Sequence, residues 1–132
     1  MRFTEHELTD ALTGAAKDVL AAQNKDVRKG RLDIDTLWDG LDRFQRFQVL
    51  DGLGSEILPV LVALPDVEVV SGARATYTDH QVTETVESLV DPDLGRLKRV
   101  VAVKTRTALV QSALSHLPLR SDPDTLEVPD HL

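Results

Sequence analysis

Hydrophobic and polar residues recur with a helical period over much of the chain, most clearly near the N-terminus. Between Thr4 and Gln23 the hydrophobic positions return every three or four residues, which is the spacing of one helix face. Thr4 and Glu7 also have the spacing of a capping box, in which each side chain binds the backbone N–H of the other residue. Thr78 and Gln81 form a second such pair before a similar stripe. The pattern therefore predicts helices over residues 4–23 and from 78 to about 90.

The stretch from residue 36 to 65 contains the most hydrophobic run of the chain and three of its five aromatic residues. Burial of a large apolar side chain contributes roughly 1.5–3 kcal/mol. We therefore expect Trp38, Phe44 and Phe47 to lie in the core of the fold.

Within this stretch the periodicity predicts two elements. Thr36 is the expected N-cap of a first helix, which should end near Gly52 and Gly54 because glycines commonly follow a helix C-terminus. Ser55 is then the expected cap of a second segment, residues 56–64, which is hydrophobic on every side. Such a segment should be buried, either in the fold or in an oligomer.

Residues 94–117 fit two different periods. Read as a helix, the segment has two hydrophobic faces, the first with Leu97, Val101, Ala108 and Ser112 and the second with Val103, Val110, Leu114 and Leu117. The run from 100 to 107 also alternates and is rich in β-branched residues, which is typical of a strand. We favour one helix between Pro92 and Pro118, which suits a partner as well as a core; a strand at about 98–107 is the alternative.

The other segments are expected to be connections. Residues 24–31 carry four cations around a glycine, which indicates an exposed loop. Residues 67–77 alternate around a Ser-Gly pair, so a small β-hairpin there competes with an irregular connection. Residues 119–132 contain prolines and four acidic residues, which is typical of a tail.

These elements predict a mainly α fold, a compact bundle of four or five helices with the hairpin as an optional addition. The 132 residues are enough for one domain with a sizeable core. We expect a single helical domain over residues 1–118, followed by the acidic, Pro-containing tail at 119–132. An α+β fold with the strand at 98–107 is the alternative.

Charge is distributed unevenly along the chain. The formal net charge is −7, but residues 32–93 hold thirteen acidic and three basic residues, whereas residues 94–121 hold six basic residues and no acidic one. The basic segment should therefore lie on the acidic part of its own fold or of a second copy. Its cations at 96–106 could also contact nucleic acid, but the net negative charge and the lack of a nucleic-acid-binding motif disfavour that partner.

Composition bounds the setting of the protein. The chain has no cysteine, which excludes disulfides and thiol chemistry and suits a cytoplasmic protein. It has no hydrophobic run of 18 residues and no signal-peptide core at its N-terminus. We expect a soluble, intracellular protein without a membrane partner.

Candidate chemistry is sparse. Asp33, Asp35 and Asp39 could offer carboxylates to a hard cation, but Leu37 and Trp38 stand where a calcium loop needs a ligand and a glycine, so no metal is predicted. Among the four histidines, His80 is the best acid–base candidate, with Asp79 beside it and Glu84 one turn away. A first-turn surface histidine explains these three residues equally well. The sequence indicates no cofactor.

The sequence therefore favours a protein-interaction or oligomerisation module without catalytic activity. The residues expected at its interface are Ile57, Leu58, Leu61, Arg96, Arg99 and Arg106. The partner would be a second copy, giving a homodimer, or another protein. A helical small-ligand pocket or small enzyme using His80, Asp79 and Glu84 is one alternative, and nucleic-acid contact through 96–106 is another.

Overall fold

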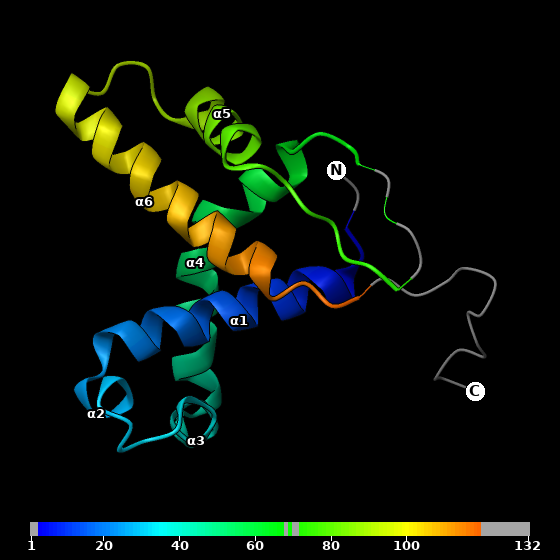
Figure 1. Ribbon diagram of the computed structural model, residues 1–132. Coiled ribbons are helices and arrows are strands. Elements are labelled where there is room, and N and C mark those ends of the chain that lie inside the picture. Colours follow the sequence, from blue (N-terminus) through cyan, green and yellow to red (C-terminus); the bar gives the residue numbers. More distant parts are fainter. Residues whose placement is uncertain (1–2, 68, 70–71, 120–132) are drawn as a thin grey trace.

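The computed structural model describes residues 3–67, 69 and 72–119, and this part of the chain is mainly helical (Figure 1). Its six helices are α1 Glu5–Gln23, α2 Lys25–Arg28, α3 Ile34–Gly40, α4 Arg43–Ala63, α5 Asp79–Leu89 and α6 Arg96–Ser115. The mainly α class predicted from the sequence is confirmed. The segment 98–107 is helical, so the strand alternative is wrong.

Three of the helices begin at capping boxes. In α1 the Glu7 N–H donates to Thr4 Oγ1 at 3.0 Å and the Thr4 N–H donates to Glu7 Oε1 at 2.9 Å. The same reciprocal pair starts α5 at Thr78 and Gln81. Both helices were predicted from these residues. A third box at the start of α4 was missed in the sequence.

That third box corrects the prediction for residues 36–65. Asp42 accepts from the Gln45 N–H at 2.8 Å and starts α4, whereas Asp33, rather than Thr36, caps the short helix α3. From Arg43 the helix continues to Ala63 through both glycines and through Pro59, so the break expected near Gly52 and Gly54 does not occur. The Asp-x-x-Gln pair sets a new N-terminus that hydrophobic periodicity alone does not reveal.

Gly54 lies inside α4 at the point where this helix passes α1. It is buried, and a Cβ built on it would lie 3.9 Å from Cδ1 of Leu12 in α1. The glycine therefore marks the crossing of α1 and α4. The distance to Leu12 is an ordinary van der Waals contact, so an alanine would also fit at this position.

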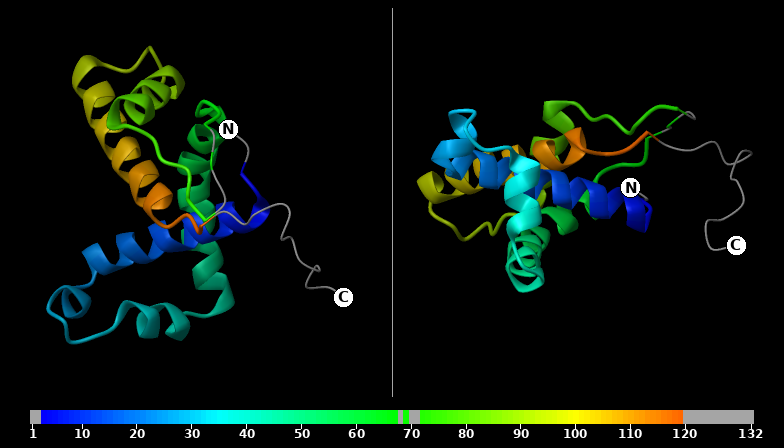
Figure 2. Two further views of the ribbon diagram at one scale, coloured as in Figure 1. Left: turned by 45° about the vertical axis from the view of Figure 1, so that its right-hand side comes forward. Right: turned by 90° about the horizontal axis from the view of Figure 1, so that it is seen from below.

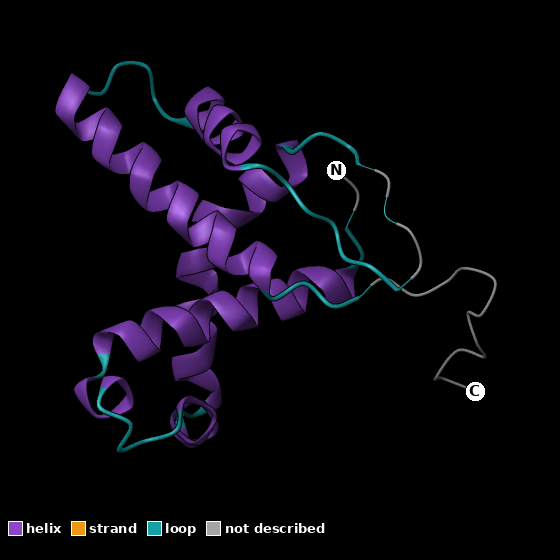
Figure 3. Ribbon diagram, viewed as in Figure 1, coloured by secondary structure: helices purple, strands orange, loops and turns teal. Residues whose placement is uncertain are grey.

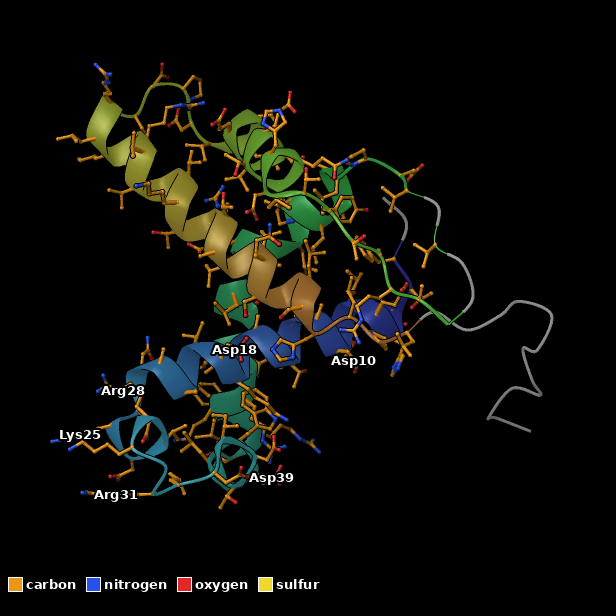
Figure 4. All side chains as sticks on the ribbon, viewed as in Figure 1. Asp10, Asp18, Lys25, Arg28, Arg31 and Asp39 are labelled. Carbon is orange, nitrogen blue, oxygen red and sulfur yellow. The ribbon has the colours of Figure 1, made fainter. Side chains whose placement is uncertain are left out.

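Residues 24–31 also differ from the exposed loop that was expected. They contain α2, one turn of helix whose N-cap Asn24 accepts from the Val27 N–H at 3.0 Å. The cations Lys25, Arg28 and Arg31 stand around this corner of the molecule (Figure 4). The local Asn cap is sufficient for one helical turn, although the charge pattern resembles that of a loop.

The core lies where α1, α4, α5 and α6 meet (Figures 1 and 3). Each helix contributes small or branched side chains that are fully buried: Ala11 and Ala15 from α1, Ile57, Val60 and Leu61 from α4, Val82 and Val86 from α5, and Val110 and Ala113 from α6. Alanines on α1 let the helices approach closely. Helix α4 begins beside α3. Its first half extends beyond α1 and lies outside this core (Figure 2).

The aromatic residues divide between core and surface. Trp38 of α3 is 7% exposed, as expected, but Phe44 and Phe47 are 66% and 61% exposed, so the prediction that they are buried is wrong. Both phenylalanines lie on the half of α4 that extends beyond α1. The described part of the chain places no element over these two side chains.

Two expectations fall partly or wholly outside the described residues. The hairpin near 67–77 includes residues 68, 70 and 71, and the described residues of that segment contain no strand. The tail predicted at 119–132 lies outside them after Leu119. Among the described helices, none is both long and apolar enough to cross a membrane.

Candidate interaction surface

The two halves of helix α6 are buried to different extents. Its C-terminal half carries Val110, Ala113 and Leu114, which are buried against the other helices, and Leu117 just beyond it is buried as well. Its N-terminal half contacts α5 but leaves a large part of its circumference in solvent. Figure 1 shows this half of α6 reaching outward beside α5.

The exposed side of this N-terminal half is hydrophobic. Leu97 is 81% exposed and Val101 is 62% exposed, and Ala108 continues the same face toward the bundle. These residues belong to the first of the two faces that the sequence indicated, whereas the second face provides the buried residues. Contiguous apolar surface on a soluble protein can mark an interaction site, so this face is a candidate for one.

A groove runs beside this stripe, between α6 and the middle of α4. Its volume is about 430 Å³, and its walls are mainly apolar. It is lined by Glu56 of α4 and by Leu97, Lys98, Val101, Ala102, Thr105 and Arg106 of α6. Hydrophobic side chains thus form most of its surface, and the charged lining residues are the cations Lys98 and Arg106 of α6 and the anion Glu56 of α4.

Most of the cations of α6 have no partner in the described part of the chain. Arg96, Lys98, Lys104 and Arg106 make no hydrogen bond or ion pair with the described part of the chain. The direct pairing expected between the basic segment and the acidic part of its own fold is therefore not formed within these residues. The four side chains keep their charge available to a partner.

Arg99, by contrast, is used inside the chain. Its Nη2 donates to the carbonyl oxygen of Glu87 at 3.0 Å, and its Nη1 donates to those of Val90 and Asp91 at 3.2 and 3.3 Å. These carbonyls end α5, where a cation also interacts favourably with the helix dipole. Arg99 therefore joins α6 to α5, although it was expected at an interface.

The hydrophobic residues expected at an interface lie in or near the core. Ile57 and Leu61 are fully buried among residues of the same chain, and Leu58 is half-buried. The segment that is hydrophobic on every side is therefore buried on one face only, because Val62 is 65% exposed and Pro59 and Ala63 are also exposed. Of the six residues expected at an interface, Arg106 lines the groove, and Arg96 lies at the start of the same helix without a partner among the described residues.

The residues considered for acid–base chemistry, Asp79, His80 and Glu84, are all exposed on α5. His80 Nε2 lies 3.5 Å from Glu84 Oε2, and the two side chains are 86% and 72% exposed. Asp79 instead accepts a hydrogen bond from Gln111 Nε2 at 2.7 Å. With its ring in solvent, His80 is the first-turn surface residue that the sequence also allowed.

The candidate metal ligands are dispersed as well. Asp33 caps α3 by accepting from the Thr36 N–H at 3.2 Å, and Asp35 pairs with Lys17 of α1 at 2.8 Å. Asp39 stands at the opposite end of α3 (Figure 4). In the part of the chain that the structure describes, no three His, Asp or Glu side chains are placed to hold a metal ion.

One polar cluster was not predicted. On α1, Asp18 Oδ2 accepts from Ser112 Oγ at 2.7 Å and lies 2.8 Å from His116 Nε2 (Figure 4 labels Asp18). The ring of His116 also borders an open cleft of about 450 Å³ with Lys17 and Asp35. Because serine and histidine bind the same carboxylate oxygen, the serine is not aligned with the histidine as a nucleophile with its base.

No sequence signal brings this cluster together, because Asp18 is 94 residues from Ser112 and 98 from His116. Its partners tie the end of α6 to α1. Comparison with known proteins adds no further indication: no family model matches the chain, and neither the curated proteins nor the solved structures give a match.

Proposed function

We propose that this protein is a non-catalytic interaction module that binds an acidic, amphipathic helix of another protein along the N-terminal half of α6. The observation that carries the proposal is the exposed pair Leu97 and Val101 with cations on either side that have no partner among the described residues. The groove beside the pair supplies a concave surface for the bound helix.

The binding mode follows from the two kinds of side chain. Hydrophobic residues at helical spacing on the partner would cover Leu97 and Val101, as in other helix-in-groove complexes. Carboxylates on the partner's flanks would reach Lys98 and Arg106 and set its orientation. Hydrophobic burial provides most of the affinity in this arrangement, and the charges provide selectivity.

Other occupants fit this surface less well. A second copy that bound through the same face would bring Arg96, Lys98, Lys104 and Arg106 close to their own duplicates, and like charges oppose such a contact. A nucleic acid would pair with the cations, but aliphatic side chains at the centre of the face offer it no stacking partner.

A labelled peptide tests the proposal. The probe is a synthetic helix with leucines on one face and glutamates on its flanks, and its control is a peptide of the same composition in scrambled order. Fluorescence anisotropy with the full chain should show binding of the amphipathic peptide and at least about tenfold weaker binding of the scrambled one. Binding should persist in part at high salt, because the hydrophobic contact is not screened.

Variants locate the binding site. Leu97→Ser combined with Val101→Ser should abolish binding, and Lys98→Glu combined with Arg106→Glu should weaken it. Leu89→Ser is a matched control, because Leu89 is 41% exposed on α5. Equal binding of both peptides, or loss of binding in the control alone, would contradict the proposal. Duplex DNA binding that exceeds peptide binding and disappears with salt would instead favour the nucleic-acid alternative.

A further inference from the structure

The second exposed hydrophobic surface lies on the opposite side of the molecule, on the first half of α4. Phe44 and Phe47 are each more than 60% exposed there, on the part of the helix that extends beyond α1 (Figure 2). A hollow of about 380 Å³ adjoins Phe47 and is lined by Arg43, Arg46 and Leu50. Two large aromatic side chains beside an open hollow are typical of an interface.

The charges along this surface have a definite order. Arg43 and Asp51 are both exposed, and neither makes a hydrogen bond or ion pair through its side chain with the described residues. Arg46 is already engaged, since its Nε and Nη2 both donate to the Leu41 carbonyl at 3.0 and 2.9 Å. The unpaired cation Arg43 therefore lies four residues before Phe47, and the unpaired anion Asp51 lies four residues after it.

We propose that a second copy of this chain binds here, with the two α4 helices antiparallel and a two-fold axis beside Phe47. A two-fold contact must be self-complementary, so that each residue meets the one placed symmetrically to it. In the antiparallel pair, Arg43 of one copy lies level with Asp51 of the other, about 6 Å along the helix from the axis. Both charge pairs form, and Phe44 lies level with Leu50 of the second copy.

The order of the charges selects this occupant. A parallel arrangement would place Arg43 beside Arg43 and Asp51 beside Asp51. Both contacts would be unfavourable, because each brings like charges together. The α6 face has cations alone and lacks this self-complementary order. The dimer therefore leaves both α6 faces open, and the inference stands whether or not the peptide-binding proposal holds.

Sedimentation of the full chain over a wide concentration range tests the dimer. The wild-type mass should rise with concentration from the 14.6 kDa monomer toward twice that value. Arg43→Asp alone places two anions together at each end of the contact, and Asp51→Arg alone places two cations together. Each single variant should weaken the dimer by about tenfold or more.

The two single variants also provide the decisive mixture. When Arg43→Asp and Asp51→Arg are combined in equal amounts, each copy meets the opposite charge on the other, so a dimer of one of each should form with near wild-type affinity. Residues 43 and 51 are about 12 Å apart along one helix, so this recovery cannot arise within one chain.

Three controls complete the experiment. Phe47→Ser should give a monomer, and its helical circular dichroism should match the wild type because the side chain is exposed. Leu97→Ser should leave the dimer unchanged. A wild-type chain that stays monomeric throughout, or a mixture that behaves like the single variants, would overturn the proposal.

Discussion

The imidazole of His116 packs directly on the backbone of α1 at Gly14, in the space that a Cβ on that residue would occupy. The same ring lies 2.8 Å from Asp18 one turn further along α1. Gly14 is buried, and the contact fixes the end of α6 on α1. The contact with His116 therefore explains why a glycine stands at position 14, in the middle of α1.

This contact predicts opposite effects for two glycine-to-alanine substitutions. In an exposed helix interior the change is favourable by about 0.5–1 kcal/mol, and Gly52 in α4 has open space around it. Gly14→Ala must displace the ring of His116 and should lower the free energy of unfolding by about 1–3 kcal/mol. Urea denaturation of the two variants measures both changes.

A double variant separates the steric contact from other effects of the alanine. In a His116→Ala background the ring is absent, so adding Gly14→Ala should cost little or even stabilise α1. The difference between the two backgrounds is the coupling of Gly14 and His116. An equal loss in both backgrounds would show that the ring does not limit residue 14.

Arg99 supplies the second prediction. Arg99→Met keeps the hydrophobic stem but removes the hydrogen bonds to the carbonyls of Glu87, Val90 and Asp91 at the end of α5. The free energy of unfolding should fall by about 1–2 kcal/mol. Arg96→Met is the matched control on the same helix, and because Arg96 has no partner among the described residues, it should change little. Equal melting temperatures for the two variants would argue against the capping role.

The third prediction compares two aromatic residues that the sequence treats alike. Trp38 is 7% exposed and Phe44 is 66% exposed. Trp38→Ala should cost about 3–5 kcal/mol, because it removes a large buried side chain and leaves a cavity. Phe44→Ala should cost less than about 0.5 kcal/mol when measured on the monomer. A loss for Phe44→Ala as large as that for Trp38→Ala would place Phe44 in the core.

These cases show which parts of the fold the sequence can predict. Local rules suffice where one helix end is set by its own residues, as for Thr4 with Glu7 and Thr78 with Gln81. Local rules mislead where packing against a neighbouring helix determines the structure. Gly54 resembles a helix end, yet it is a buried residue inside α4, where this helix passes α1.

The surface could be predicted only in part. The two faces of residues 94–117 were visible as patterns, and the structure shows which is buried and which carries Leu97 and Val101 in solvent. Exposure of Phe47 could not be predicted, because it depends on how far α4 extends beyond α1. Likewise, the partners of Asp18 lie almost the whole described chain away, and only the packing of α6 on α1 brings them together.

The last prediction concerns a buried hydroxyl. Thr107 Oγ1 on α6 is shielded from solvent and has no hydrogen-bond partner in the described part of the chain. An unsatisfied buried polar group costs about 1–3 kcal/mol, and valine has a similar shape without that group. Thr107→Val should therefore raise the free energy of unfolding by about 1 kcal/mol, whereas Thr105→Val, at an exposed position on the same helix, should change it by less than about 0.5 kcal/mol. Thermal and urea unfolding of both variants provide the measurement, and a destabilised Thr107→Val would mean that the hydroxyl makes a hydrogen bond in solution.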